Sequence, residues 1–108
     1  MAINSKQKGK KGELEACSKL KEHGWQARRS QQYAGINSDA DIIGLPGHHI
    51  EVKRVERLNI EDAMTQAKAD CRDGDIPIVM HRKNNCEWLI TIRADDYLSK
   101  VLQGLWED

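Results

Sequence analysis

The sequence predicts an α/β fold in which helices flank a mixed central β-sheet. Apolar residues repeat with helical spacing in three segments, which are residues 10–23, residues 60–72 and the stretch from residue 94 onward. Short apolar runs of strand type, bounded by glycine, proline or asparagine, fill the space between them. The predicted element order is αβββαββα.

The first helix is expected from about Lys10 to His23, and Gly24 ends it. The 108 residues suffice for one domain, residues 1–108, of which residues 1–8 are expected to form a mobile basic arm. The apolar stripe of the helix consists of side chains at helical spacing: Leu14, Ala16, Cys17 and Leu20.

Three strands are expected next. The first covers residues 25–30 and is followed by a loop over residues 31–38. The second and third, around Asp41 and Glu51, are separated by a Pro-Gly turn. Sequential strands of this kind pair antiparallel.

The second half begins with a helix from Ile60 to Arg72, followed by a buried strand over residues 76–80. A helical crossover between two strands of one sheet makes them parallel neighbours, which is why the sheet is expected to be mixed. A strand from Glu87 to Ile92 and a last helix starting near Ala94 complete the order.

Composition is that of a water-soluble domain, with 39% hydrophobic and 31% charged residues. No apolar run approaches the roughly 20 residues of a membrane span, and residues 1–12 are polar and basic, unlike a secretory signal. We therefore expect no membrane association and a cytoplasmic location, which is the host cytoplasm if the protein is viral. Cys17, Cys71 and Cys86 stand far apart without metal-ligand spacing, which suits a reducing compartment.

Charge is unevenly distributed although the net charge is zero. Residues 1–54 hold 10 Lys and Arg against 6 Asp and Glu, whereas residues 55–108 hold 7 against 11. A basic rim around an acidic centre suits an enzyme that binds a polyanion through a metal. Ordinary scatter of surface charge is the alternative.

A carboxylate-lysine cluster is predicted where the second and third strands pair. Strand side chains alternate between faces, so Glu51 and Lys53 share one face while Ile50 and Val52 share the other. Asp41 can converge with Glu51 and Lys53, and two carboxylates with an ammonium can hold a hard divalent cation and orient a water. The tandem histidines His48 and His49 are expected in a surface turn, and His81 is expected to border the site.

These residues resemble the PD-(D/E)XK nuclease superfamily, and within it the archaeal-type Holliday-junction resolvases and their phage relatives. The resemblance covers residues 8–81 and rests on five matching segments, namely Lys8-Gly9-Lys10-Lys11-Gly12-Glu13, Gly24-Trp25 with Arg29, Ala40-Asp41-Ile42-Ile43, Ile50-Glu51-Val52-Lys53, and Gln66 on the second helix. Ala40 replaces the usual proline, and Ser30 and Ser38 are both candidates for a serine that relatives carry. The resemblance implies a restriction-endonuclease-like αβββαβ core.

The resemblance also implies the chemistry. Asp41, Glu51 and the Val52 carbonyl would bind Mg²⁺, for which Mn²⁺ would substitute, and Glu13 would contact the metal through water or bind a second ion. Lys53 would orient the attacking water or stabilise the transition state, and Gln66 would hold the water or the phosphate. Asp39, on the same strand face as Asp41, is an outer-ligand candidate.

The expected substrate is branched or duplex DNA, cut by hydrolysis of phosphodiester bonds in a four-way junction. Symmetric cutting of two strands implies a homodimer, with the last helix and the exposed sheet face as candidate interfaces. Glu15 is expected to face solvent. The DNA contacts are expected from basic side chains near the cleft: Lys8, Lys10, Lys11, Arg28, Arg29, Arg54, Arg57 and Arg82.

Two alternatives stay open. One is a general or nicking DNA nuclease of the same fold, and the other is a DNA-binding domain without catalytic activity. The presence of Glu13, Asp41, Glu51 and Lys53 together argues against the second, because a silent relative would be expected to have lost at least one of them.

Overall fold

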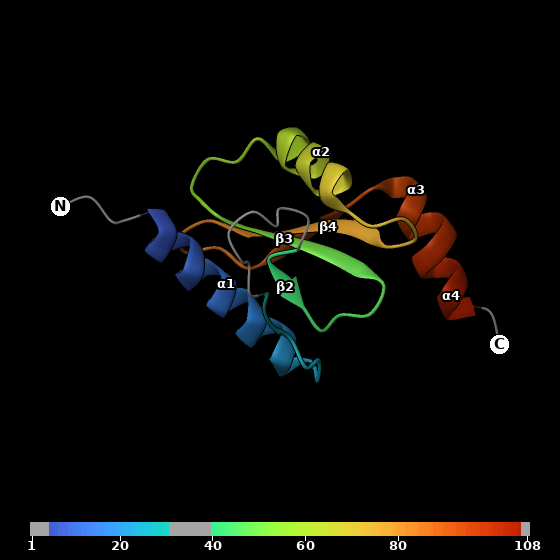
Figure 1. The fold of residues 1–108 in the computed structure, drawn as a ribbon, viewed down its shortest axis with the longest axis horizontal. Helices are drawn as coiled ribbons and strands as arrows, with labels where there is room; N and C mark the ends of the chain where they lie inside the picture. The colour runs from blue at the N-terminus through green and yellow to red at the C-terminus, as the bar shows by residue number, and fades with distance from the viewer. Residues whose placement is uncertain (1–4, 31–39, 107–108) are drawn as a thin grey trace.

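A computed structural model describes residues 5–30 and 40–106, with side chains described from Gly9 to residue 104 outside the same gap. Figure 1 shows the helices packed around a central sheet. The elements follow the chain as α1 (Ser5–Glu22), β1 (Arg28–Arg29), β2 (Ile42–Ile43), β3 (His48–Arg54), α2 (Ile60–Asp70), β4 (Ile76–Arg82), β5 (Leu89–Ile92), α3 (Ala94–Asp96), the π-helical η1 (Tyr97–Val101) and α4 (Leu102–Trp106).

The sheet has five strands in the order β1-β2-β3-β4-β5. Strands β1, β2 and β3 pair antiparallel, as sequential hairpin strands do. Strand β4 pairs parallel with β3 because α2 carries the chain back across the sheet, and β5 returns antiparallel to β4. The predicted α/β class, mixed sheet and element order are confirmed, and the order contains the expected αβββαβ core.

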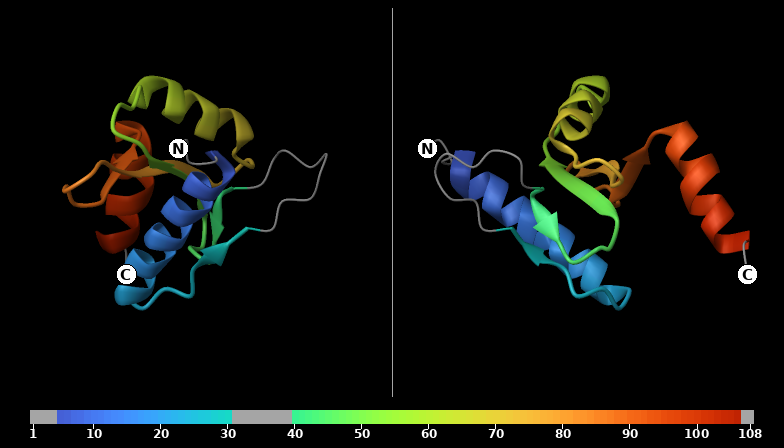
Figure 2. Two further views of the ribbon diagram at one scale, coloured as in Figure 1. Left: turned by 90° about the vertical axis from the view of Figure 1, so that its left-hand side faces the viewer. Right: turned by 45° about the vertical axis from the view of Figure 1, so that its right-hand side comes forward.

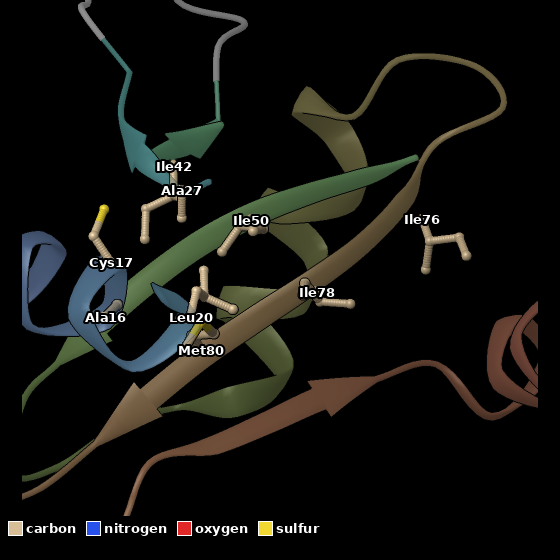
Figure 3. Close-up of a cluster of buried hydrophobic side chains, with 9 residues drawn as sticks. All are labelled: Ala16, Cys17, Leu20, Ala27, Ile42, Ile50, Ile76, Ile78 and Met80. Carbon is tan, nitrogen blue, oxygen red and sulfur yellow. The ribbon is translucent and has the colours of Figure 1, made fainter. Parts of the chain in front are cut away.

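The main core lies between α1 and the sheet, where Leu20 of α1 lies beside Met80 and Cys17 points toward the side of Ala27 and Ile42 (Figure 3). Val101 of the C-terminal helix packs against the same cluster. This face takes the even-numbered residues of β3. The odd-numbered residues of that strand therefore point to the opposite face, where α2 packs.

Helix α2 packs closely on its face because its buried residues, Ala63 and Ala67, are small. Both alanines pack against Val79 of β4, which is the register partner of Glu51. Asn59 caps the N-terminus of this helix, because its side-chain oxygen accepts a hydrogen bond from the backbone N–H of Asp62 at 3.1 Å. The face that carries Glu51 is thus covered by a helix fixed at its N-terminus.

Several boundaries differ from the sequence prediction. Helix α1 begins at Ser5, so residues 5–8, expected in a mobile arm, are helical; residues 1–4 lie outside the described residues. Strand β1 is shorter than expected because the chain is still closing α1 at Trp25, whose N–H bonds the Leu20 carbonyl at 3.2 Å. The predicted loop over residues 31–38 lies outside the described residues.

The C-terminal helix runs through α3, η1 and α4 and leans away from α1 and α2 (Figure 2). It leaves Tyr97 43% and Leu98 58% exposed. Among the described helices, none is both long enough and apolar enough to cross a membrane.

Candidate active site

Asp41 is fixed at the junction of β2 and β3 by two bonds. Its backbone N–H donates to the Ile50 carbonyl at 2.9 Å, and its Oδ2 accepts from the backbone N–H of Val52 at 2.8 Å. In a strand, the N–H and C=O of one residue point to the same edge. The Val52 carbonyl therefore points to the β3 edge at which Asp41 lies.

Glu51 lies beside Asp41, near enough for each carboxyl group to shift the pKa of the other. The pKa of Asp41 is raised to about 6, mainly because burial removes water from the carboxyl group. The neighbouring charge of Glu51 acts in the same direction, whereas the Val52 N–H opposes it. The pair thus retains a proton at a pH where isolated carboxyl groups have lost theirs.

Burial also raises the pKa of Glu51, whose residue is only 5% exposed. Lys53 follows two residues later on the same strand face and is half-buried. Its ammonium lowers the pKa of both Asp41 and Glu51. The convergence of Asp41, Glu51 and Lys53 expected from strand alternation is therefore present.

His49 occupies the same strand face and is buried, so the prediction that it lies in a surface turn is wrong. Its Nε2 lies 2.8 Å from Glu51 Oε1. His48 does behave as a turn residue, half-buried with Nδ1 2.8 Å from the Pro46 carbonyl oxygen. No motif marked His49, and the available signal was its position two residues before Glu51 on one strand face.

His81 borders the site as expected, because it is the register partner of Lys53 on β4. Its Nε2 lies 2.8 Å from the Thr91 hydroxyl, and burial lowers its pKa. Beside it a cavity of about 400 Å³ opens at the carboxyl ends of β3 and β4, lined in part by Val55, Leu58 and Leu89.

Glu13 projects from α1 but is engaged by an arginine. Its Oε1 accepts from Arg29 Nε at 2.8 Å, and its charge contributes to the raised pKa of Glu51. Gln66 lies on α2, exposed, and makes no hydrogen bond to the described carboxylates or to Lys53. The structure thus places Glu13 at the margin of the cluster and Gln66 outside it, while Asp39 and Ser38 lie outside the described residues.

Two predicted DNA-contacting arginines are held by Glu15. Arg82 Nη1 lies 2.8 Å from Glu15 Oε1, and Arg54 Nε lies 3.5 Å from Glu15 Oε2. The prediction that Glu15 faces solvent is wrong, because its side chain is only 27% exposed. Arg54 Nη2 also donates to Asn84 Oδ1 at 3.0 Å, whereas the buried Arg54 Nε has no hydrogen-bond partner among the described residues.

The other residues predicted to contact DNA differ in how exposed they are to solvent. Arg29 is half-buried on Glu13. The side chain of Lys8 lies outside the described side chains, although its backbone is helical. Exposed cationic residues remain on α1, β1 and the loop after β3: Lys10, Lys11, Arg28 and Arg57.

The donor set fits Mg²⁺. In the described part of the chain, no group of three or more His, Cys, Asp or Glu side chains is placed to hold a metal. Mg²⁺ is held in proteins by one or two carboxylates, with waters and substrate phosphates completing its shell. Asp41 and Glu51 supply two such carboxylates, and their raised pKa values reflect a pair that a cation would relieve.

No protein-family model matches the chain, and no curated protein sequence matches it. A solved structure does match it, that of Hjc from Archaeoglobus fulgidus, a Holliday junction resolvase from an archaeal hyperthermophile. The superposition has a TM-score of 0.56 at 23% sequence identity and covers 78% of this chain and 76% of the other. The chain therefore has the fold of an archaeal Holliday junction resolvase.

Proposed function

We propose that this protein is a Mg²⁺-dependent, structure-selective DNA endonuclease that resolves four-way junctions by paired phosphodiester hydrolysis. The observation that carries the proposal is the cluster of Asp41, Glu51 and Lys53 at the β2–β3 junction of a resolvase-like fold. Two buried carboxylates beside a lysine are poorly explained by stability, because their mutual repulsion and desolvation oppose folding.

Each residue has a distinct role in this proposal. Asp41 and Glu51, with the Val52 carbonyl, would hold Mg²⁺ or Mn²⁺, and the bound cation supplies Lewis-acid polarisation of the scissile phosphate and a water of lowered pKa. Lys53 orients the attacking water and offsets the charge that develops on the phosphate. Glu13, held by Arg29, would contact the metal through water or bind a second ion.

DNA would be held by charge and shape rather than by base contacts. The exposed Lys10, Lys11, Arg28 and Arg57 are the described residues that suit phosphate contact. Arg54 and Arg82, held by Glu15, would instead keep the ends of β3 and β4 in place. Two symmetric cuts require two sites, so we propose that the active form is a homodimer.

The test is cleavage of a labelled four-way junction beside a linear duplex of matched arm sequence, with Mg²⁺ or with EDTA. Wild type is compared with Asp41→Asn and with Asp73→Asn, the same substitution at an exposed position. We expect paired symmetric nicks in the junction alone, lost with EDTA and in Asp41→Asn but kept in Asp73→Asn.

Other outcomes select the alternatives. Equal cutting of junction and duplex would favour a general nuclease of this fold. Binding of the junction without cutting in Mg²⁺ or Mn²⁺ would contradict the enzymatic proposal and leave a DNA-binding domain.

A further inference from the structure

A buried histidine faces the candidate metal ligand Glu51 from the same strand face. His49 and Glu51 are 5% and 6% exposed in their side chains, and Nε2 lies 2.8 Å from Oε1. Nothing in the roles of Asp41, Glu51 and Lys53 uses this histidine. A polar side chain buried this deeply normally has a partner, and the partner here is the carboxylate itself.

The direction of the hydrogen bond follows from the charge state of Glu51. Glu51 can act as a metal ligand only with its carboxyl group ionised, because a divalent cation binds the deprotonated carboxylate. A carboxylate oxygen has no hydrogen to donate. The imidazole must then carry its hydrogen on Nε2 and donate it to Glu51 Oε1.

The neighbours of the His49–Glu51 pair on β4 and on the packed face of α2 are apolar. The register partner of Glu51 on β4, Val79, is fully buried beneath Ala63 and Ala67 of α2. The register partner of His49 is Pro77, which has no backbone N–H to offer. An unrestrained glutamate side chain also loses more rotamer entropy on binding than a fixed one.

We propose that His49 is a positioning residue, which donates its Nε2 hydrogen to one oxygen of Glu51 and so holds the other oxygen toward the divalent cation. This inference rests on the proposed function, because it assigns the orientation of a ligand of the same metal site. Groups that hydrogen-bond a metal ligand typically contribute 10–100-fold to metal affinity.

The test measures Mn²⁺ binding by calorimetry without DNA, in wild type, His49→Leu and His49→Gln. We expect His49→Leu to weaken Mn²⁺ binding 10–100-fold, and His49→Gln, whose amide N–H can replace the Nε2 hydrogen, to stay within a few-fold of wild type. Melting in EDTA serves as the stability readout. Equal Mn²⁺ affinity in His49→Leu and wild type would overturn the inference.

A double-mutant cycle separates action through Glu51 from a general loss of structure. In a Glu51→Gln background, we expect His49→Leu to cause no further loss of Mn²⁺ affinity. A full additional loss in that background would contradict the positioning role.

Nitrogen-15 NMR of the wild-type imidazole tests the inference even if His49→Leu does not fold. A ring protonated on Nε2 supports it, and a ring protonated only on Nδ1 overturns it. If wild type binds Mn²⁺ and His49→Leu binds it equally well, only this inference fails. If wild type binds no Mn²⁺, the proposed function fails, and this inference fails with it.

Discussion

At the scale of single residues, the site is a balance between the desolvation of two carboxyl groups and the groups that offset it. Asp41 gains a backbone N–H, and both carboxyl groups gain the nearby Lys53 ammonium. These contacts are outweighed, since the pKa of both residues is raised. The site therefore stores unfavourable electrostatic free energy that a bound cation would release.

This balance predicts how the metal-free protein responds to pH. The folded pKa of Asp41, about 6, exceeds its ordinary value of 3.8, so between these values the folded state holds more protons than the unfolded state. The free energy of unfolding of the metal-free wild type should therefore fall as pH rises through this window, by up to about 3 kcal/mol. In EDTA, Asp41→Asn should be about 1–3 kcal/mol more stable than wild type at pH 8, with the difference vanishing near pH 3.5.

Urea unfolding across this pH range provides the measurement. Asp73→Asn is the matched control, because Asp73 is exposed, and it should follow wild type at every pH. If Asp41→Asn were less stable than wild type at pH 8, the charge of Asp41 would be favourable in the folded state and the balance described above would be wrong.

The same balance predicts stabilisation by metal. At pH 8, Mg²⁺ at about 100 times its dissociation constant should stabilise wild type by about 2.7 kcal/mol, because the ion binds only the folded state. Asp41→Asn and Glu51→Gln should gain much less. Thermal melting with and without Mg²⁺ measures the difference, and an equal gain in wild type and both variants would place the binding elsewhere.

At the scale of elements, the contact between α1 and β3 holds the two sides of the site together. Gly12 is buried, and a Cβ at that position would lie 2.6 Å from the Arg54 Cβ. Arg54 in turn reaches back to Glu15 on α1. The close approach of helix and strand thus depends on a residue without a side chain.

Two glycines of one helix give a matched pair of tests. Gly12→Ala should destabilise the protein by about 1–3 kcal/mol, because the added methyl group has no space beside Arg54. Gly9→Ala should instead stabilise it by about 0.5–1 kcal/mol, since nothing lies near that position and alanine is the better helix former. Urea unfolding of both variants measures this, and equal effects would argue against close packing of α1 on β3.

Local patterns were sufficient to predict the elements and the cluster, whereas contacts between distant elements were not predictable. Period-two alternation placed Glu51 and Lys53 on one face, because that pattern belongs to a single strand. His49 was misassigned because adjacent histidines after a Pro-Gly turn look exposed until α2 covers their face. Glu15 was misassigned because its partner Arg82 lies 67 residues away.

At the scale of the whole molecule, four of the seven large apolar side chains exposed among the described residues lie on β5 and the following helix, at the C-terminal end of the chain. Leu89 and Ile90 on the edge strand β5 are 52% and 51% exposed, and Tyr97 and Leu98 on the following helix are also uncovered. An edge strand beside an apolar helix face is a surface that natural proteins usually cover. Trp88, which precedes β5, packs against the core, and the side chains of Leu105 and Trp106 lie outside the described residues.

A second copy of this chain would cover that end with an isologous interface, and Leu98 tests this. Leu98→Glu places a charge on the most exposed of these side chains, at 58%, and should convert a dimer to a monomer, because interface cores exclude charged residues.

Sedimentation measures the oligomeric state, and a supercoiled cruciform plasmid reports whether both strands are cut in one binding event. We expect the variant to release nicked rather than linear plasmid. Leu14→Glu, at a 49% exposed position on α1, should remain dimeric, and a Leu98→Glu variant that also stays dimeric would exclude this end as the interface.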